Sequence, residues 1–218
     1  MSITAEQNSG TELKLFRELP DFYAVIKPRG MASEGELPAA LLRLLRESGR
    51  DAAEPYVVHR LDRPTAGLMI LAKNKRAAAE ISEIIKNGGF HKTYTAFAVK
   101  NPALGDSGEM RDYLFFDRRR DKSFIADPRK PSAKSAVLTY SLYDSFTFDN
   151  IESAAYHVYP ETGRSHQIRI QFASRGAPLI GDGKYGSRQK AHCAALISTG
   201  IRFGDVELSL PDPAFGEY

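Results

Sequence analysis

The sequence "HRLDRPTAGLMILAK", residues 59–73, joins a charged segment directly to an apolar one. Asp62 lies between Arg60 and Arg63, and the apolar run 67–73 has the length of a buried strand. The residues "YVV" just before the stretch are also apolar. Asp62 is therefore predicted at a break between two strands, where a polar side chain can face a cleft while the backbone stays packed.

Outward from this stretch, short apolar segments alternate with segments of helical periodicity. Because the strands outnumber the helices, and the helices fall between groups of strands, we predict an α+β fold. Its central sheet is mixed and largely antiparallel, with flanking helices and loops. The predicted strands are 22–30, 67–73, 92–100, 135–146, 151–160, 192–198 and 206–210, and the predicted helices are 37–49, 75–89 and 163–176.

The segment 117–134, "DRRRDKSFIADPRKPSAK", is polar and basic and contains two prolines. We interpret it as a long loop. Loops of this length are uncommon in compact domains and often carry function.

The composition is that of an ordinary soluble globular protein, with 42% apolar and 26% charged residues in a chain of 218. No apolar run approaches the roughly 18 residues that a membrane span needs, and the N-terminal sequence lacks the apolar core of a secretory signal. Cys193 is the only cysteine, which excludes an internal disulfide and a cysteine metal cluster. We expect a cytoplasmic protein.

Charge is unevenly distributed along the chain. Residues 59–134 hold 16 basic and 9 acidic residues, and residues 164–190 hold six basic residues and one acid. The remainder is acidic, so the net charge is only +3. Such segregation is typical of a protein with a polyanionic partner such as a nucleic acid, although solvated loops and helix faces would also produce it.

Three other patterns do not indicate chemistry. "GAPLIG" resembles the start of a phosphate-binding loop, but Asp182 stands where that motif requires lysine. Asp182 is instead interpreted as structural, in a glycine-rich turn. The five histidines show no metal-ligand spacing, so we predict no metal site. Ser165 and His166 are sequence neighbours, and adjacent residues on a helix point in different directions, so they do not form a nucleophile–base pair.

Asp62 itself permits two interpretations from its chemistry alone. It is either a surface residue in a turn with solvated arginines beside it, or a cleft residue with a function. Tyr94 in "KTY" and Arg169 in "HQIR" occur in similar contexts near the ends of predicted elements. This recurrence favours the functional interpretation.

Four motifs occur in order: "HRLDRPTAGLMILAK", "KTYTAFAV", "TGRSHQIRIQF" and "GAPLIGDGKYG". Together they resemble the RluA-type family of pseudouridine synthases, and the resemblance extends over about residues 22–210. Two positions depart from the pattern of many members: Gln171 replaces a histidine, and Arg63-Pro64 follows the aspartate. These departures concern the choice of substrate and not the reaction.

The resemblance implies an enzyme that isomerises specific uridines in structured ribosomal or transfer RNA, without cofactor or metal. Asp62 matches the essential aspartate, which acts either as nucleophile on the anomeric carbon or as base at the 2′ position. Arg169 matches the arginine that pairs with it, since a nearby cation favours the charged carboxylate. Tyr94 matches the tyrosine that stacks on the flipped uracil and serves in the proton step. Arg60 matches the arginine that fills the stack left by the flipped base.

The resemblance also implies a domain organisation and an RNA-binding surface. We expect a flexible N-terminal tail at 1–15, and a single pseudouridine synthase-like catalytic domain at 16–218 with no separate N-terminal RNA-binding domain. The partner is RNA, with neither membrane nor metal involved, and the protein is expected to be a monomer. The predicted RNA-contacting residues are Arg60, Arg118, Arg119, Arg120, Arg164, His166 and Lys184.

Two alternatives remain at this stage. One is a protein of the same fold that binds RNA without catalysing a reaction. The other is a nucleosidase or glycosidase, which needs two acid–base carboxylates. Asp182 would be the second carboxylate in that case.

Overall fold

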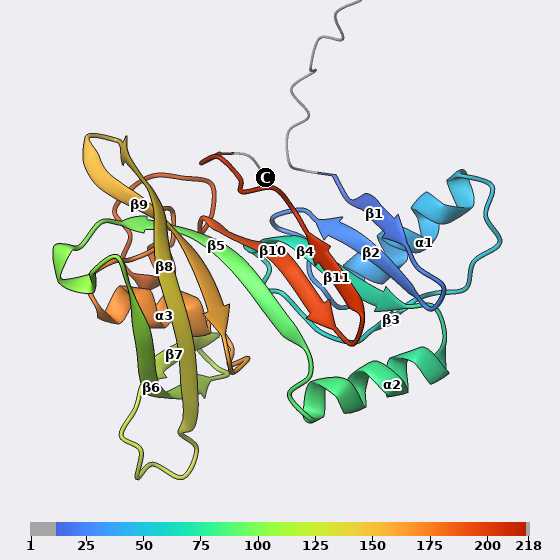
Figure 1. Ribbon diagram of the computed structural model, residues 1–218, viewed down its shortest axis with the longest axis horizontal. Coiled ribbons are helices and arrows are strands. Elements are labelled where there is room, and N and C mark those ends of the chain that lie inside the picture. The colour runs from blue at the N-terminus through green and yellow to red at the C-terminus, as the bar shows by residue number, and fades with distance from the viewer. Residues whose placement is uncertain (1–11, 217–218) are drawn as a thin grey trace, which may run out of the picture.

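The computed structural model describes residues 12–216, which form one continuous sheet with helices packed against it (Figure 1). The strands are β1 (Lys14–Glu18), β2 (Phe22–Lys27), β3 (Tyr56–Val57), β4 (Ala66–Ala72), β5 (His91–Val99), β6 (Ser107–Asp117), β7 (Lys122–Ile125), β8 (Lys134–Phe148), β9 (Ile151–Pro160), β10 (Leu196–Phe203) and β11 (Val206–Ser209). The helices are α1 (Glu36–Glu47), α2 (Lys75–Lys86) and α3 (Gln167–Ser174), with 3-10 turns at Pro102–Leu104 and Gly183–Tyr185.

The sheet follows the order β1-β2-β4-β10-β5-β9-β8-β6-β7, with β11 beside β10 and β3 beside β4. Every pairing in the described part of the chain is antiparallel except that of β10 with β4. The prediction of an α+β fold with a mixed, largely antiparallel sheet is therefore confirmed.

Gly67 marks the point where β4 and β10 run parallel. Its φ is +110°, and a Cβ at this position would overlap the backbone of Ser198, with which Gly67 is paired in register. Only glycine combines that backbone conformation with so close an approach of two chains. The last residue of the motif "HRLDRPTAG" thus joins the Asp62 segment to the centre of the sheet.

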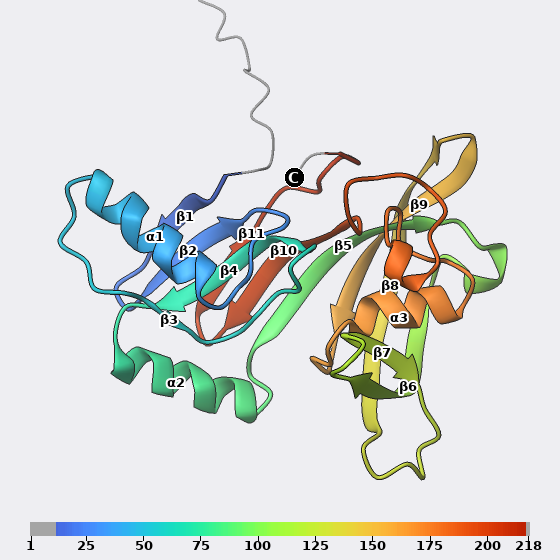
Figure 2. The same ribbon diagram turned by 180° about the vertical axis from the view of Figure 1, so that it is seen from behind.

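The helices cover opposite faces of the sheet. Leucines 37, 41 and 45 of α1 lie in the same apolar cluster as Ile168 and Phe172 of α3. Ile81 of α2 belongs to a separate cluster that contains Leu68 and Ile70 of β4. Figure 2 shows α1 and α3 on the near side of the sheet. None of the helices among residues 12–216 is long and apolar enough to cross a membrane.

The predicted loop 117–134 is wrong in part, because it contains β7 and a tight turn, and β6 immediately before it was not predicted. Strand β6 has the sequence "SGEMRDYLFFD", in which Met110 and Leu114 are buried and most of the remaining residues are exposed or half-buried. Its apolar residues show no clear alternation, so the strand gives no clear signal. It forms because β8 and β7 pair with its two edges.

Other boundaries also differ from those predicted from the sequence. The last long strand is β10 at Leu196–Phe203 instead of 192–198, and β1 includes Lys14 and Leu15, which the sequence placed in the N-terminal tail. The remainder of that predicted tail, residues 1–11, lies outside the described residues. Helix α3 is shorter than predicted because His166, just before it, has a left-handed backbone conformation.

Candidate active site

A cleft of about 1140 Å³ opens around Asp62, between the segments that carry the sequence motifs. One wall comes from the loop between β2 and α1 and from residues 60–64. The other wall comes from the β6–β7 turn and from residues before, within and after α3. Segments far apart in the sequence therefore meet at this point, as expected for an enzyme site.

The loop that carries Asp62 is fixed to the β2–α1 loop by a buried lysine. Lys27 is 0% exposed, and its Nζ donates to the carbonyl oxygens of Pro28 at 2.9 Å, Met31 at 2.9 Å and Arg63 at 3.4 Å. Burial lowers the pKa of Lys27 to about 8, while attraction to Asp62 opposes that shift. Lys27 thus connects the two loops through their backbones.

A second connection between the same loops is made by a neutral side chain. The hydroxyl of Ser33 donates to the Leu61 carbonyl at 2.8 Å and accepts from the Leu61 N–H at 3.0 Å. The Thr65 N–H donates to the Asp62 carbonyl at 2.9 Å, which closes a turn at the aspartate. The backbone of Asp62 is thereby held on both sides, which limits the positions that its carboxylate can take.

The two arginines that flank Asp62 in the sequence do not pair with its carboxylate in the described structure. Arg63 donates to the Gly30 carbonyl at 2.7 Å and pairs with Glu36 at 2.5 Å. Arg60 is exposed at the cleft, 3.6 Å from Glu34. Arg63 therefore braces the loop, and Arg60 stays accessible to a ligand.

The cation beside Asp62 comes from α3, as predicted from the sequence. Nη1 of Arg169 lies 3.3 Å from Oδ2 of Asp62. The guanidinium is 4% exposed, whereas the Asp62 side chain is 21% exposed and faces the cleft. A buried cation therefore lies directly beside a carboxylate that faces the cleft.

Asp182 holds Arg169 in place through a buried bidentate ion pair. Its Oδ2 accepts from Arg169 Nε at 2.7 Å and its Oδ1 from Nη2 at 2.9 Å. Burial alone would lower the pKa of Arg169, but pairing with Asp182 and Asp62 outweighs burial and raises it. Asp182 does lie in a turn, as interpreted from the sequence, but that interpretation missed its contact with Arg169. The signal that could have shown it is the single acid in the basic segment 164–190.

Tyr94 lies on β5 and is 7% exposed, within the apolar cluster that also contains Leu61. It is not among the described residues that line the cleft. No described residue forms a hydrogen bond with its hydroxyl, and Lys92 Nζ lies 6.0 Å from the centre of its ring. The structure therefore places Tyr94 in the core, with no hydrogen-bond partner for its hydroxyl among the described residues.

The predicted RNA-contacting residues divide into two groups. Arg60, His166 and Lys184 line the cleft, and Nε2 of His166 lies 3.8 Å from Oδ2 of Asp62. Lys184 pairs with Asp121 of the β6–β7 turn at 2.6 Å. The other predicted contacts do not line the cleft but are exposed beside it on the turn and before α3: Arg118, Arg119, Arg120 and Arg164.

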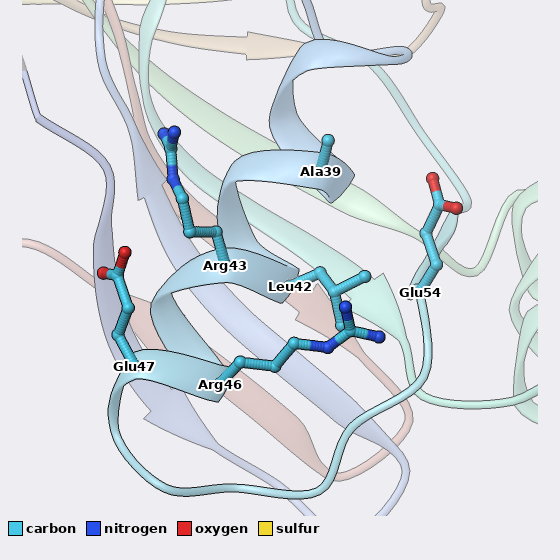
Figure 3. Close-up of a pocket in the computed structure, with 6 residues that line it drawn as sticks. All are labelled: Ala39, Leu42, Arg43, Arg46, Glu47 and Glu54. Carbon is cyan, nitrogen blue, oxygen red and sulfur yellow. The ribbon is translucent and has the colours of Figure 1, made fainter.

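A smaller hollow of about 280 Å³ lies against the outer surface of α1 (Figure 3). Its charged side chains are exposed and of both signs, and it contains no residue of the predicted motifs. We assign it no function. It is lined by Ala39, Leu42, Arg43, Arg46, Glu47 and Glu54.

Comparison with known families agrees with this geometry. A family model described as RNA pseudouridylate synthase matches residues 21–174, which include Asp62, Tyr94 and Arg169. The chain belongs to this family. The match ends before Asp182, so the carboxylate that holds Arg169 in place lies outside the matched region.

Individual relatives support the same assignment. Ribosomal large subunit pseudouridine synthase C of Rickettsia bellii is 29% identical over 187 residues, which is 85% of this chain and 60% of that protein. An uncharacterized RNA pseudouridine synthase of Bacillus subtilis is 31% identical over 220 residues, covering 93% of this chain and 70% of the relative. The chain thus spans about 60–70% of the length of these two relatives.

Two solved human structures show the same fold. RNA pseudouridylate synthase domain containing 4 superposes with a TM-score of 0.76 at 22% identity, covering 93% of this chain and 90% of its own. RNA pseudouridylate synthase domain containing 1 gives a TM-score of 0.79 at 22% identity, with coverages of 95% and 86%.

Proposed function

We propose that this protein is an RNA pseudouridine synthase that isomerises uridines in structured ribosomal or transfer RNA. The observation that carries the proposal is the pairing of Asp62 with Arg169 at 3.3 Å in a large cleft with cations around it. Membership of the RNA pseudouridylate synthase family supports the same reaction. The names of the Rickettsia relatives favour ribosomal RNA as one substrate.

The reaction breaks the bond between N1 of uracil and C1′ of ribose and forms a bond from C5 to C1′. C5 loses a proton and N1 gains one, so no oxidant or cofactor is required. Asp62 serves either as nucleophile at C1′ or as base at the 2′ position. In both roles its carboxylate must be charged inside a partly dry site, and Arg169 supplies the compensating charge.

Tyr94 and Arg60 have complementary roles in this proposal. Tyr94 stacks on the flipped uracil, and its unpaired hydroxyl takes part in removing the C5 proton. Tyr94 is buried and does not line the cleft among the described residues, so the uracil reaches its hydroxyl only if the wall of the cleft moves when RNA binds. Arg60 is exposed and lies at the cleft, where a planar guanidinium can fill the gap that the base leaves and recover part of the stacking energy.

Basic residues beside the cleft bind the RNA backbone in this proposal. They are Lys184 at the cleft and the exposed group Arg118, Arg119, Arg120 and Arg164. Contacts of this kind give affinity and orientation without reading the base sequence. His166 also lines the cleft, where it was predicted to contact RNA.

The position of Asp182 weighs against a nucleosidase or glycosidase. Such an enzyme needs two carboxylates that exchange protons with substrate or water. Both oxygens of Asp182 accept hydrogen bonds from Arg169, and its side chain is 2% exposed. Asp182 is therefore buried against Arg169 and out of reach of substrate or water.

Tritium release from RNA labelled at C5 of uridine tests the proposal. We expect the purified protein to release tritium and to form pseudouridine without releasing free uracil. Asp62→Asn should lose turnover below detection, while its RNA affinity stays within about tenfold, or about 1.4 kcal/mol. Asp51→Asn, an exposed change outside the cleft, is the matched control. Binding without tritium release would identify a non-catalytic RNA-binding protein, and free uracil would identify a nucleosidase.

A further inference from the structure

His166 occupies a position next to Asp62 that the reaction as described does not use. It immediately precedes α3, its backbone is left-handed with φ 55° and ψ 22°, and its ring is 8% exposed. A non-glycine residue in this conformation is uncommon and persists where the surroundings hold it. The ring lies between Asp62 and Tyr185, with one nitrogen toward each.

The contacts of Tyr185 determine which nitrogen of His166 carries the hydrogen. The hydroxyl of Tyr185 accepts from the Ser123 N–H at 2.8 Å and lies 2.9 Å from Nδ1 of His166. The Ser123 hydroxyl also interacts with Tyr185, but its own hydrogen goes to the carbonyl oxygen of Ser165. If Nδ1 were also a donor, the hydroxyl hydrogen would have only the Ser123 oxygen to bind, and a buried hydrogen without a well-placed acceptor costs about 1–3 kcal/mol. Tyr185 therefore donates to Nδ1, and the ring hydrogen is on Nε2, facing Asp62.

The charges around the pair are consistent with a neutral ring. Burial lowers the pKa of His166, Asp62 and Asp121 oppose this shift, and Arg169 and Lys184 add to it. Burial raises the pKa of Tyr185 to about 12, so the phenol keeps its proton. A neutral histidine beside a protonated tyrosine fits the hydrogen-bond assignment.

Two donors approach the same oxygen of Asp62. Arg169 Nη1 lies 3.3 Å from Oδ2, and His166 Nε2 lies 3.8 Å from the same atom. No hydrogen bond joins Oδ1 to any described residue. The 3.8 Å separation exceeds a hydrogen bond, but contacts of this kind often shorten when substrate closes a site.

We propose that His166 is a positioning residue: Tyr185 fixes its Nε2–H form, and with Arg169 it holds Oδ2 of Asp62 so that Oδ1 is the reacting oxygen. This inference rests on the proposed function, because only that reaction makes Oδ1 a reacting atom. It changes the role of His166 from a residue that binds RNA to one that orients the carboxylate.

A matched pair of amides separates the two roles. The amide nitrogen of glutamine is four bonds from Cα, as Nε2 of histidine is, whereas that of asparagine is one bond closer. Asparagine tolerates the left-handed backbone better than glutamine. His166→Asn should therefore be the more stable variant, and His166→Gln should be the one that can still reach Asp62.

Under the positioning role, His166→Asn lowers kcat about a hundredfold, the effect of a misplaced catalytic group, and leaves the apparent KM for RNA within about twofold. His166→Gln should have a kcat about tenfold higher than that of His166→Asn, although it is less stable to urea. Tyr185→Phe removes the hydroxyl that fixes the ring, and it should lower kcat about tenfold. A raised KM with unchanged kcat would overturn the inference in favour of RNA binding. Equal kcat for the two amide variants would also overturn it.

Nitrogen NMR of histidine-labelled full-length protein tests the tautomer independently of turnover. The His166 resonances are identified by their loss in His166→Asn. At pH 7.5 we expect a neutral ring with hydrogen on Nε2, and a shift toward the Nδ1–H form in Tyr185→Phe. An Nδ1–H or doubly protonated ring in the wild type would overturn the inference even in an active enzyme. A wild type that has the expected ring but no turnover would refute the proposed function alone.

Discussion

Two buried cations contact the Asp62 loop, and their charges are compensated in different ways. Lys27 is 0% exposed and donates only to backbone carbonyl oxygens. Arg169 is 4% exposed and pairs with the carboxylates of Asp62 and Asp182. Burial lowers the pKa of Lys27 to about 8, whereas the pKa of Arg169 is raised because the two carboxylates outweigh burial.

This difference shows which of the two cations provides a fixed positive charge beside the Asp62 carboxylate. Carbonyl dipoles satisfy the hydrogens of an ammonium group but repay only part of the cost of burying its charge. Carboxylates repay that cost and fix the orientation of a planar guanidinium through paired hydrogen bonds. Lys27 therefore mainly joins two loops, and Arg169 supplies a permanent charge to Asp62.

The largest loss of stability is expected when Arg169 loses a carboxylate partner for its buried charge and so becomes more like Lys27. Asp182→Asn removes one of the two charges that compensate the guanidinium. Removing one partner from a buried ion pair costs about 3–5 kcal/mol, and Asp62 remains to limit the loss, so we expect the lower end of that range. Urea unfolding measures this cost, and turnover should fall as well because Arg169 is no longer fixed.

Asp121→Asn is the matched control for that prediction. Asp121 also pairs with a cation, Lys184, but its side chain is 69% exposed. Exposed pairs contribute about 1 kcal/mol or less, so the unfolding free energy should change little. Similar losses of unfolding free energy in the two variants would contradict the distinction between a buried ion pair and a surface ion pair.

The second effect concerns the titration of Lys27. Its pKa is about 8 in the folded protein, against the usual lysine value of 10.5. Between these pH values the unfolded chain binds more protons than the folded protein, so the contribution of Lys27 to stability rises with pH. The unfolding free energy of the wild type minus that of Lys27→Met should increase by about 2 kcal/mol from about pH 7.5 to about pH 10.

The difference between the two proteins cancels the tyrosines and other groups that titrate in both. Lys75→Met, an exposed change on α2, is the matched control. A flat curve for Lys27→Met would mean that the lysine keeps its charge throughout, and that the carbonyl oxygens compensate its burial as fully as the carboxylates compensate that of Arg169.

Sequence patterns predicted the fold, whereas the Asp62–Arg169 contact was implied only by the resemblance to a known family. Buried strands such as β4 and β9 carry strong apolar patterns, so their positions and the α+β class followed from the sequence. The resemblance of the motifs then identified the partner of Asp62, which lies 107 residues away along the chain. No local pattern could have supplied that pairing.

What the sequence missed depends on tertiary contacts. Strand β6 is stabilised by pairing with β7 and β8. Asp182 pairs with Arg169 only because the chain after α3 turns back toward that helix. Lys27 ends an apolar strand, and nothing in the sequence around it indicates that its side chain is buried. In each case the decisive partner comes from another element, so local periodicity contains no information about it.

A third, smaller effect is expected from the neutral connection on the Lys27 side. Ser33→Ala removes the hydroxyl that pairs with both the N–H and the carbonyl of Leu61, leaving buried backbone groups without partners. The cost should be about 1–2 kcal/mol, and kcat should fall while the KM for RNA stays unchanged, because Asp62 follows Leu61. Ser48→Ala, which removes an exposed hydroxyl bonded to Leu44, is the control. An unchanged kcat would show that the charged contacts alone hold Asp62.

The smallest effect is expected from cations that are not buried at all. Arg118, Arg119 and Arg120 are exposed on the β6–β7 turn, and Asp117 partly neutralises them. Replacing all three with alanine should weaken RNA binding by about 1 kcal/mol and lower the salt slope by about 2, because fewer counterions are released. Turnover at saturating RNA should persist, since backbone contacts position the RNA and do no chemistry.

The control is a triple alanine variant of α2, at Lys75, Arg76 and Lys86. These three residues are also exposed and basic, but α2 packs on the sheet face opposite α1 and α3. Apparent dissociation constants at several salt concentrations should change for the turn and not for α2. Superimposable salt curves for the turn variant and the wild type would remove the turn from the RNA surface. Equal changes in both variants would mean that net charge, and not the placement of cations beside the cleft, governs binding.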